Sequence, residues 1–223
     1  QGLRSFDVVS RTQHRVERPQ GSQGTSDMAR FKVPRSRAHL QHQAMRDRLL
    51  ESVGKVLFRA HLLDNASLRP LEARFAEVME RRYAFGVNSG TAGLFLALKA
   101  CGVGDGDEVI TVGNSDISTT AAISHCGARP VISEVLKTDY TMNPVHAESL
   151  VSEQTKAVLP VDLYGYPADV KRIGEFASRH GLRVIEDAAL AAGAKDYGEP
   201  VGAFADVAIF SFGAYKPLGS AGN

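Results

Sequence analysis

The stretch that decides the fold is LRVIEDAA at residues 182–189, a short apolar run followed by two carboxylates and two alanines. It comes directly after Gly181, which in turn follows a helical pattern at 168–179. A short apolar run bounded in this way is typical of a buried strand. Helix, glycine and strand recur in this order in the neighbouring segments. The sequence therefore predicts an α/β domain in three layers, α/β/α, with a mostly parallel sheet covered by helices on both faces.

The alternation of strand and helix begins near residue 83. The expected strands are 84–87, 108–112, 129–133, 157–161, 182–185 and 207–210. The expected helices between them are 91–101, 118–126, 144–151 and 168–179. Gly102, Gly127 and Gly181 each follow one of these helices, where a left-handed residue commonly ends the helix. We therefore expect residues 83–223 to form one α/β domain.

The chain before residue 83 has a different character. Residues 1–27 are polar, show no sustained period and are expected to be a disordered leader. Residues 28–82 carry two amphipathic patterns, which predict one helix from His39 to Ala60 and another from Ser67 to Arg81. The expected organisation is thus a leader, a helical segment and the larger α/β domain.

The composition is that of an ordinary globular chain: 223 residues, a net charge of +1, 43% hydrophobic and 23% charged residues. Two cysteines, Cys101 and Cys126, do not make a disulfide scaffold or a Cys-based zinc site, and they fit a reducing, cytoplasmic compartment. No apolar run approaches the ~18 residues of a membrane span. Residues 1–60 hold 12 Lys and Arg against 5 Asp and Glu, but no nucleic-acid-binding pattern accompanies them. Neither a membrane nor a nucleic acid is an expected partner.

Polar motifs follow three of the expected strands, at the edge where parallel α/β sheets bind ligands. The first is NSGTAG at 88–93, which leads directly into a helix. Gly90 permits a tight turn, and the free N–H groups at the start of a helix form a seat for an anion. The hydroxyls of Ser89 and Thr91 could add hydrogen bonds. Alternatively, Ser89 or Thr91 only caps the helix.

A carboxylate and a lysine follow the last two expected strands. Asp187 could contact a ring nitrogen or a metal, or could simply cap a helix. Because no second ligand cluster stands at metal spacing, no metal site is predicted. Lys216 lies in a loop bounded by Gly and Pro, five residues after Ser211. Such a lysine is normally a solvated surface residue, but in an apolar cleft its amine can form a Schiff base with a carbonyl.

Pyridoxal 5'-phosphate (PLP) is the cofactor that needs these three motifs together. Its phosphate needs an anion seat, its pyridinium nitrogen a carboxylate, and its aldehyde a lysine. The motifs occur in that order, each just after an expected strand, and so predict a PLP site. A plain Rossmann-type nucleotide-binding module is the alternative, and the missing G-x-G-x-x-G fingerprint weighs against it.

The motifs resemble those of the DegT/DnrJ/StrS family of PLP-dependent sugar aminotransferases, which has the aspartate-aminotransferase fold, fold type I. The matching stretches are VNSGTA at 87–92, GDGDEVI at 104–110, LYG and PAD at 163–165 and 167–169, IEDAA at 185–189, and FSF at 210–212 with Lys216. The resemblance covers about residues 30–223.

This resemblance implies a role for each motif. Lys216 would bond to the aldehyde of the cofactor and then carry the proton between the substrate carbon and the cofactor. Asp187 would pair with the pyridine nitrogen. The phosphate would lie on Gly90, Thr91, the Ala92 backbone and Ser211.

The resemblance also implies a reaction, the transfer of an amino group, typically from glutamate, to a nucleotide-linked keto sugar. The product would serve polysaccharide or antibiotic biosynthesis, and the full-length protein would be a homodimer. Two alternatives use the same cofactor. One is a sugar dehydratase, although the dehydrating relatives carry His where Lys216 stands. The other is a PLP-binding regulator without turnover.

Three residues depart from the usual family pattern, and the chain ends early. Asp116 stands where the family usually has an aromatic ring stacked on the pyridine, Leu190 where many members have Gln, and Asp162 where His is common. The family continues beyond residue 223 and adds a small C-terminal domain. We therefore expect these 223 residues to be an inactive fragment, truncated before that small domain.

Overall fold

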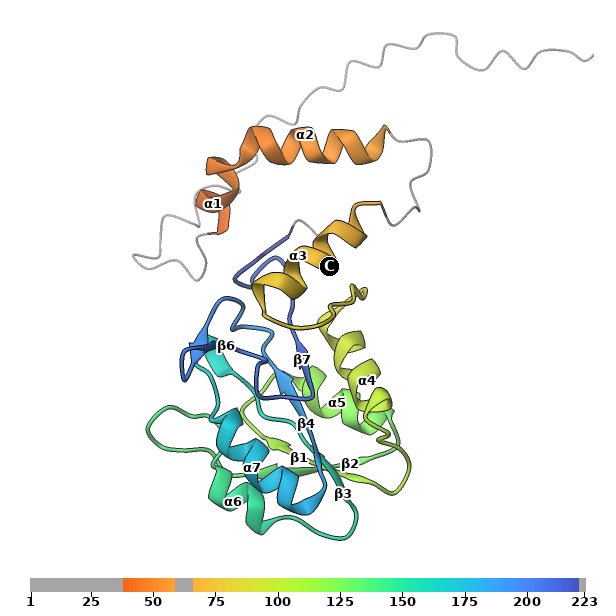
Figure 1. Cartoon of the computed structure of the whole chain (residues 1–223), viewed down its shortest axis with the longest axis vertical. Helices are drawn as coiled ribbons and strands as arrows, with labels where there is room; N and C mark the ends of the chain where they lie inside the picture. Colours follow the sequence, from red (N-terminus) through yellow and green to blue (C-terminus); the bar gives the residue numbers. More distant parts are fainter. Residues whose placement is uncertain (1–37, 59–65, 221–223) are drawn as a thin grey trace, which may run out of the picture. The chain divides into compact units, whose positions relative to one another are not determined.

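The computed structural model describes residues 38–58 and 66–220, all within one compact unit, Ala38–Asn223 (Figure 1). The described residues form a five-stranded sheet in the order β2-β1-β3-β4-β7, in which every pair of neighbours is parallel. Its strands are β1 (Glu108–Val112), β2 (Arg129–Ser133), β3 (Thr155–Val158), β4 (Arg183–Asp187) and β7 (Val207–Ile209). The predicted mostly parallel α/β fold is confirmed.

Helices cover both faces of this sheet, as the α/β/α prediction requires (Figure 1). On one side α4 (Gly90–Ala100) lies against α5 (Ile117–His125), and on the other α6 (Pro144–Ser149) lies against α7 (Val170–His180). All five residues of β1 are buried. This burial explains why β1 has no alternating pattern of apolar and polar residues, since an inner strand of a parallel sheet with helices on both faces exposes neither side. The edge strand β2, in contrast, is only partly buried.

The helices before the sheet differ in part from the prediction. Within the described residues they are α1 (Ala38–Ala44), α2 (Arg46–Leu57) and α3 (Leu68–Val78). The single helix predicted for 39–60 is wrong, because the backbone of Met45 (φ −109°, ψ 9°) leaves the helical region and separates α1 from α2. The predicted leader, residues 1–27, lies outside the described residues.

The strand predicted at 84–87 is also wrong. No described strand pairs with these residues, and the Gly86 N–H instead donates to Glu72 Oε1 in α3 at 2.8 Å. Phe85 is 75% exposed, so its apolar side chain does not enter the core. A short apolar run identifies a buried strand only when a neighbouring strand is available to pair with it, and the sequence pattern does not report that neighbour.

Two features complete the frame around the carboxyl ends of the strands. A short antiparallel hairpin, β5 (Lys195–Asp196) and β6 (Glu199–Pro200), was not predicted from the sequence. Arg81, just after α3, binds the loop that precedes β7 through carbonyl oxygens. These belong to Gly202, Ala203, Ala205 and Asp206, at 2.7, 3.3, 3.0 and 3.0 Å.

The predicted left-handed glycines after helices are confirmed, with φ of 79° at Gly102, 85° at Gly127 and 66° at Gly181.

Replacing Gly127 by alanine should destabilise the fold more than replacing Gly181. Both substitutions put a side chain on a left-handed backbone, which costs about 1–2 kcal/mol. A Cβ at Gly127 would in addition overlap the Asp105 carboxylate and lie 3.2 Å from the Asp105 Cα, whereas nothing lies within 4 Å of a Cβ at Gly181. Urea unfolding of the two variants measures the difference. Equal losses of stability would contradict this expectation, because they would show that the turn at Asp105 moves away from the added Cβ at no cost in free energy.

Candidate active site

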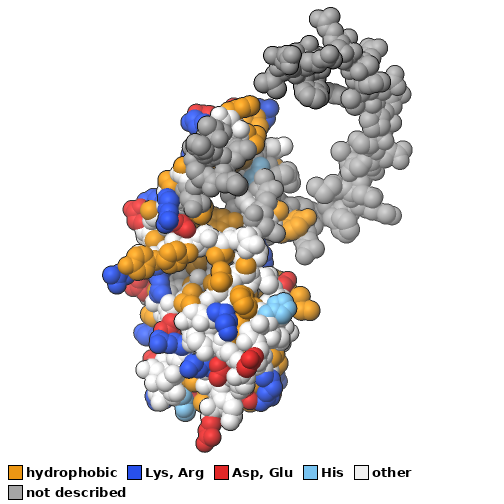
Figure 2. Space-filling model, turned by 90° about the vertical axis from the view of Figure 1, so that its right-hand side faces the viewer, with side chains coloured by type: hydrophobic (Ala, Val, Ile, Leu, Met, Phe, Trp, Pro, Cys, Tyr) orange, Lys and Arg blue, Asp and Glu red, His pale blue; other side chains and the backbone are white. Residues whose placement is uncertain are grey.

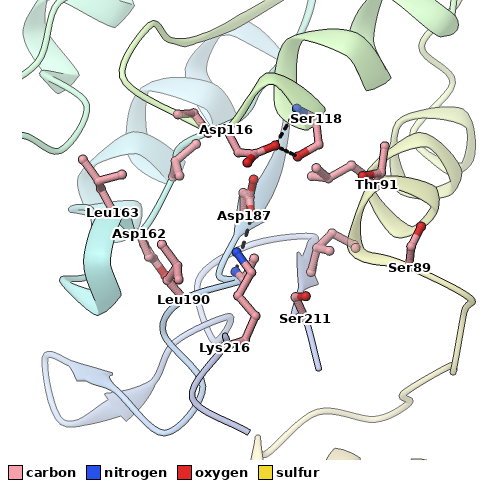
Figure 3. Close-up of a pocket in the computed structure, with 16 residues that line it drawn as sticks. Ser89, Thr91, Asp116, Ser118, Asp162, Leu163, Asp187, Leu190, Ser211 and Lys216 are labelled. Atoms are coloured by element: carbon pink, nitrogen blue, oxygen red, sulfur yellow. Dashed lines mark hydrogen bonds between the residues drawn. The ribbon is translucent and has the colours of Figure 1, made fainter. Parts of the chain in front are cut away.

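The predicted chemical motifs meet in one cavity at the carboxyl ends of the strands (Figure 3). From β1 the chain crosses to β2 on one side and later to β3 on the other, so the cavity lies where the strand order reverses. Its volume is about 210 Å³, several times the roughly 30 Å³ of one water molecule, so it admits a small molecule. Its polar lining residues are Ser89, Thr91, Ser115, Asp116, Ser118, Asp162, Asp187, Ser211 and Lys216.

Five of the six residues predicted to bind the cofactor line this cavity. They are Gly90, Thr91, Asp187, Ser211 and Lys216. Ala92 is not part of the lining, and its N–H donates to Ser89 Oγ at 3.1 Å. A role of the Ala92 backbone in holding a phosphate therefore stays a prediction.

The start of α4 is suited to an anion. Ser89 is the N-cap of the helix, which agrees with the simpler of the two interpretations of this motif. A Cβ placed on Gly90 would lie 3.5 Å from Ser211 Cβ and 3.7 Å from Ser211 Oγ, so the Ser211 hydroxyl lies beside this helix end. The N-terminus of a helix carries a partial positive charge and free N–H groups, and a neighbouring hydroxyl adds a further donor.

Asp187 is the buried carboxylate of the cavity, with 5% of its surface exposed. Its Oδ2 accepts a hydrogen bond from Thr119 Oγ1 at 3.0 Å, and its Oδ1 accepts one from the Ala189 N–H at 3.2 Å. Burial raises the pKa of Asp187, against the lowering effect of these hydrogen bonds and of the charge on Lys216. A buried carboxylate with an increased proton affinity is suited to share the proton of a heteroaromatic nitrogen.

Sequence reasoning did not single out Thr119 or Ser115. Thr119 is fully buried on α5, and its Oγ1 lies 2.7 Å from Ser115 Oγ, so a chain of hydroxyls leads to Asp187. In the sequence, Thr119 has the pattern of an ordinary residue on the buried face of a helix. Its partner lies 68 positions further along the chain, so only the packing of α5 against the end of β4 identifies its role.

Asp162 and Glu186 form a second buried acidic pair next to Asp187. They are 1% and 2% exposed, and the Asp162 N–H donates to the Asp187 carbonyl at 3.0 Å. Asp162 Oδ1 accepts from the Ala168 N–H, but Asp162 Oδ2 is buried with no hydrogen-bond donor near it. Burial, and then the charge of Glu186, raise the pKa of Asp162 to about 9. Asp162 therefore keeps its proton at neutral pH, and a proton on that buried oxygen avoids placing a second negative charge beside Glu186.

Asp162→Asn should make the fold more stable at pH 8 and should flatten its dependence on pH. Because the folded-state pKa of Asp162 is raised, the protein takes up a proton on folding between about pH 4 and pH 9. The contribution of Asp162 to the stability of the fold is therefore greatest at low pH and falls as the pH rises, by up to about 1.4 kcal/mol per pH unit. An amide does not ionise and can still donate to Glu186.

Urea unfolding at pH 5 and pH 8 measures this effect. The control is Asp105→Asn, which changes an exposed carboxylate and should leave the slope with pH as it is in the unmodified protein. A slope that survives in the Asp162 variant would contradict a protonated Asp162.

A parallel sheet with an anion seat, a buried carboxylate and a lysine at its carboxyl edge is the architecture of the large domain of PLP-dependent transferases of fold type I. Comparison with known proteins then identifies the family. The model of the DegT/DnrJ/EryC1/StrS aminotransferase family matches residues 43–223, and the chain belongs to this family. The family resemblance predicted from the sequence motifs is confirmed.

Relatives and solved structures agree with this assignment. The chain is 42% identical over 187 residues to a UDP-N-acetyl-3-dehydro-alpha-D-glucosamine 3-aminotransferase of Acidithiobacillus ferrooxidans, covering 84% of this chain and 50% of the relative. It matches the structure of S. venezuelae DesV in complex with a ketimine intermediate with a TM-score of 0.82 and 39% identity, over 85% and 51% of the two chains. It also matches NtdA from Bacillus subtilis with bound cofactor PMP, with a TM-score of 0.80 and 30% identity, over 86% and 43%.

The chain spans about half the length of the curated relatives that it matches. Among the described residues, no group of three or more His, Cys, Asp or Glu side chains is arranged to hold a metal ion. None of the helices in the described part of the chain is long and apolar enough to cross a membrane.

Proposed function

We propose that the protein is a PLP-dependent aminotransferase that moves an amino group, with glutamate as donor, to a keto sugar carried on a nucleoside diphosphate. The observation that carries the proposal is the meeting of Lys216, Asp187 and the start of α4 in one cavity. The relative from Acidithiobacillus, which is named a UDP-N-acetyl-3-dehydro-alpha-D-glucosamine 3-aminotransferase, supports the substrate class.

The lining of the cavity fits PLP. The N–H groups at the start of α4 and the hydroxyls of Thr91 and Ser211 would hold its phosphate, and Asp187 would hold the proton of its ring nitrogen. When bound, PLP supplies an electron-withdrawing ring that stabilises negative charge on the carbon next to the reacting nitrogen. Leu190 adds an apolar side chain to the lining.

Lys216 would bond to the cofactor and would later hold and move the proton at its Nζ. The loop that carries it is fixed by its own backbone, since the Lys216 N–H donates to the Gly213 carbonyl and the Lys216 carbonyl accepts from the Gly219 N–H, both at 2.9 Å. The side chain is only partly buried, and it lines the cavity together with Asp187. A fixed backbone beneath a flexible side chain suits a group that must reach two positions in turn.

The proposal includes a homodimer that acts in the cytoplasm. Ile117 and Tyr164 are 81% and 87% exposed, and they directly follow the cavity-lining residues Asp116 and Leu163. Figure 2 shows further hydrophobic side chains at the surface of the described part of the chain. Large exposed apolar side chains beside a cavity favour a covering partner. Cys101 and Cys126 are both free thiols, which fits a reducing compartment.

The bond to Lys216 can be tested directly on the full-length protein. Incubation with PLP should give a visible absorption band, and borohydride reduction followed by mass spectrometry should place the cofactor on Lys216. Lys216→Ala should lose both signals, because Lys216 is the one lysine among the described residues that line the cavity. Lys137→Ala, which changes an exposed lysine, should keep them. A protein that stays colourless with PLP would rule out the proposed cofactor.

Addition of glutamate tests the reaction as distinct from cofactor binding. An aminotransferase should convert its bound PLP to the amine form, with loss of the visible band and release of 2-oxoglutarate in equal amount. Asp187→Asn should slow this conversion by at least tenfold, because a neutral amide holds the ring proton less well than a carboxylate. A protein that binds PLP but never responds to any amino donor would instead fit a regulator.

A further inference from the structure

Ser211 lies beyond the last paired residue of the sheet. In the described part of the chain the pairing of β7 with β4 ends at Ile209, opposite Asp187. The Ser211 side chain nevertheless has a defined place, because it lines the cavity and its Oγ would lie 3.7 Å from a Cβ on Gly90. In Figure 3 it lies on the same side of the cavity as Thr91. A contact other than the sheet therefore has to hold this segment.

The rings of Phe210 and Phe212, on either side of Ser211, both pack on Phe75 of α3. The Phe210 ring meets the Phe75 ring edge-on, with centroids 5.0 Å apart and planes at 73°. The Phe212 ring is tilted against the same ring, at 5.6 Å and 59°. Aromatic pairs favour such distances and angles. On an extended chain, side chains two positions apart share one face and the residue between them takes the other, which agrees with the place of Ser211 in the cavity lining.

Phe75 is itself anchored in a small core separate from the main one. Together with Phe210, it packs against four buried side chains, those of Met79, Ala188, Ala191 and Val201. Just after the same helix, Arg81 binds the carbonyl oxygens of the loop that precedes β7. The end of α3 thus supports the Ser211 segment on the face that points away from the cavity.

The Ser211 hydroxyl has a proton to give to a ligand. Its Oγ accepts a hydrogen bond from the Gly213 N–H at 3.3 Å, and no acceptor in the described part of the chain takes its O–H. Because a hydrogen bond weakens steeply when it is misaligned, this hydroxyl helps to bind an anion only while it stays in place. The support beneath Ser211 therefore bears on the affinity of the site for a phosphate.

We propose that Phe75 is a positioning residue for the phosphate: its ring holds Phe210 and Phe212, and through them keeps the Ser211 hydroxyl beside the start of α4. The proposal rests on the proposed function, because the phosphate in question is that of PLP. Phe75 does not line the cavity, so it acts on the ligand through Ser211. It gives α3, none of whose residues lines the cavity, a part in recognising the cofactor.

The test compares PLP with pyridoxal, which has the same ring and aldehyde but no phosphate. Calorimetric titration of the cofactor-free, full-length protein gives the Kd of each. Phe75→Leu keeps an apolar side chain but removes the ring, and it should weaken PLP binding by about three- to tenfold and pyridoxal binding by less than about twofold. An effect passed through Ala188 to Asp187 would instead weaken both ligands equally and would overturn the proposal. Phe212→Leu, which breaks the contact from the other side, should give the same selective loss.

The matched control is Phe204→Leu. Phe204 is also partly buried and also pairs edge-on with another ring, that of Tyr197 at 6.1 Å, but it does not line the cavity. This variant should lower the stability of the protein and leave the ratio of the two Kd values as it is. If the ratio changed as much as in Phe75→Leu, any loosened aromatic pair would produce the effect, which would contradict the proposal.

Combining Phe75→Leu with Ser211→Ala decides whether Phe75 acts through Ser211. Ser211→Ala alone should weaken PLP binding by about tenfold, as expected for the loss of a hydrogen bond to a charged group. Because the hydroxyl is then already absent, adding Phe75→Leu should weaken binding no further. Losses that multiply would show that Phe75 acts independently of Ser211, and the proposal would be wrong.

Inorganic phosphate, titrated in the same way, separates this proposal from the proposed function. If the protein binds phosphate but never PLP, the proposed function fails, while the same pair of substitutions measured with phosphate still decides the role of Phe75. If neither phosphate nor PLP binds, both proposals fail.

Discussion

The burial of the Asp187 carboxylate is the constraint on which the rest of the site depends. A carboxylate that is almost removed from water is costly unless its oxygens find donors and its charge finds a partner. Asp187 is the last residue of β4, which lies between β3 and β7 in the sheet. Its N–H donates to the Pro160 carbonyl at 2.9 Å, and this bond fixes the backbone from which the buried side chain extends. The Thr119 hydroxyl, the Ala189 N–H and the charge of Lys216 compensate for its burial.

The remaining acidic groups are arranged so that they do not add to this cost. Asp162 and Glu186 lie just as deep, but the raised pKa of Asp162 keeps that carboxyl protonated at neutral pH. Asp116 keeps its full charge, and it does so at the exposed start of α5, where water and the helix N-terminus stabilise it. The described lining of the cavity thus combines a buried carboxyl group, a protonated Asp162 and a solvated Asp116 carboxylate with one lysine. Each group differs in proton affinity because its burial differs, which is the property that acid–base chemistry requires.

Much of this could be predicted from the chain. Strand 108–112 lies where the apolar run placed it, because both faces of this inner strand are buried and the run itself is the signal. The prediction failed at 84–87, where an apolar run has no strand to pair with, and at Met45, where a helical period continues across a break in the backbone. In both cases the local pattern agreed with the prediction. At 84–87 the outcome depended on the absence of a described strand to pair with, and at Met45 on one pair of backbone angles.

The sequence by itself determined the kind of chemistry. An anion seat, a carboxylate and a lysine, each after a strand, must meet at one edge because parallel strands bring their carboxyl ends together. Only the tertiary structure decided how these groups are charged and held. The contact of Thr119 with Asp187, the raised pKa of Asp162 and the place of Ala92 outside the cavity lining depend on packing between elements far apart in the chain. Proton affinity follows burial and distance, and neither is a property of a residue's place in the sequence.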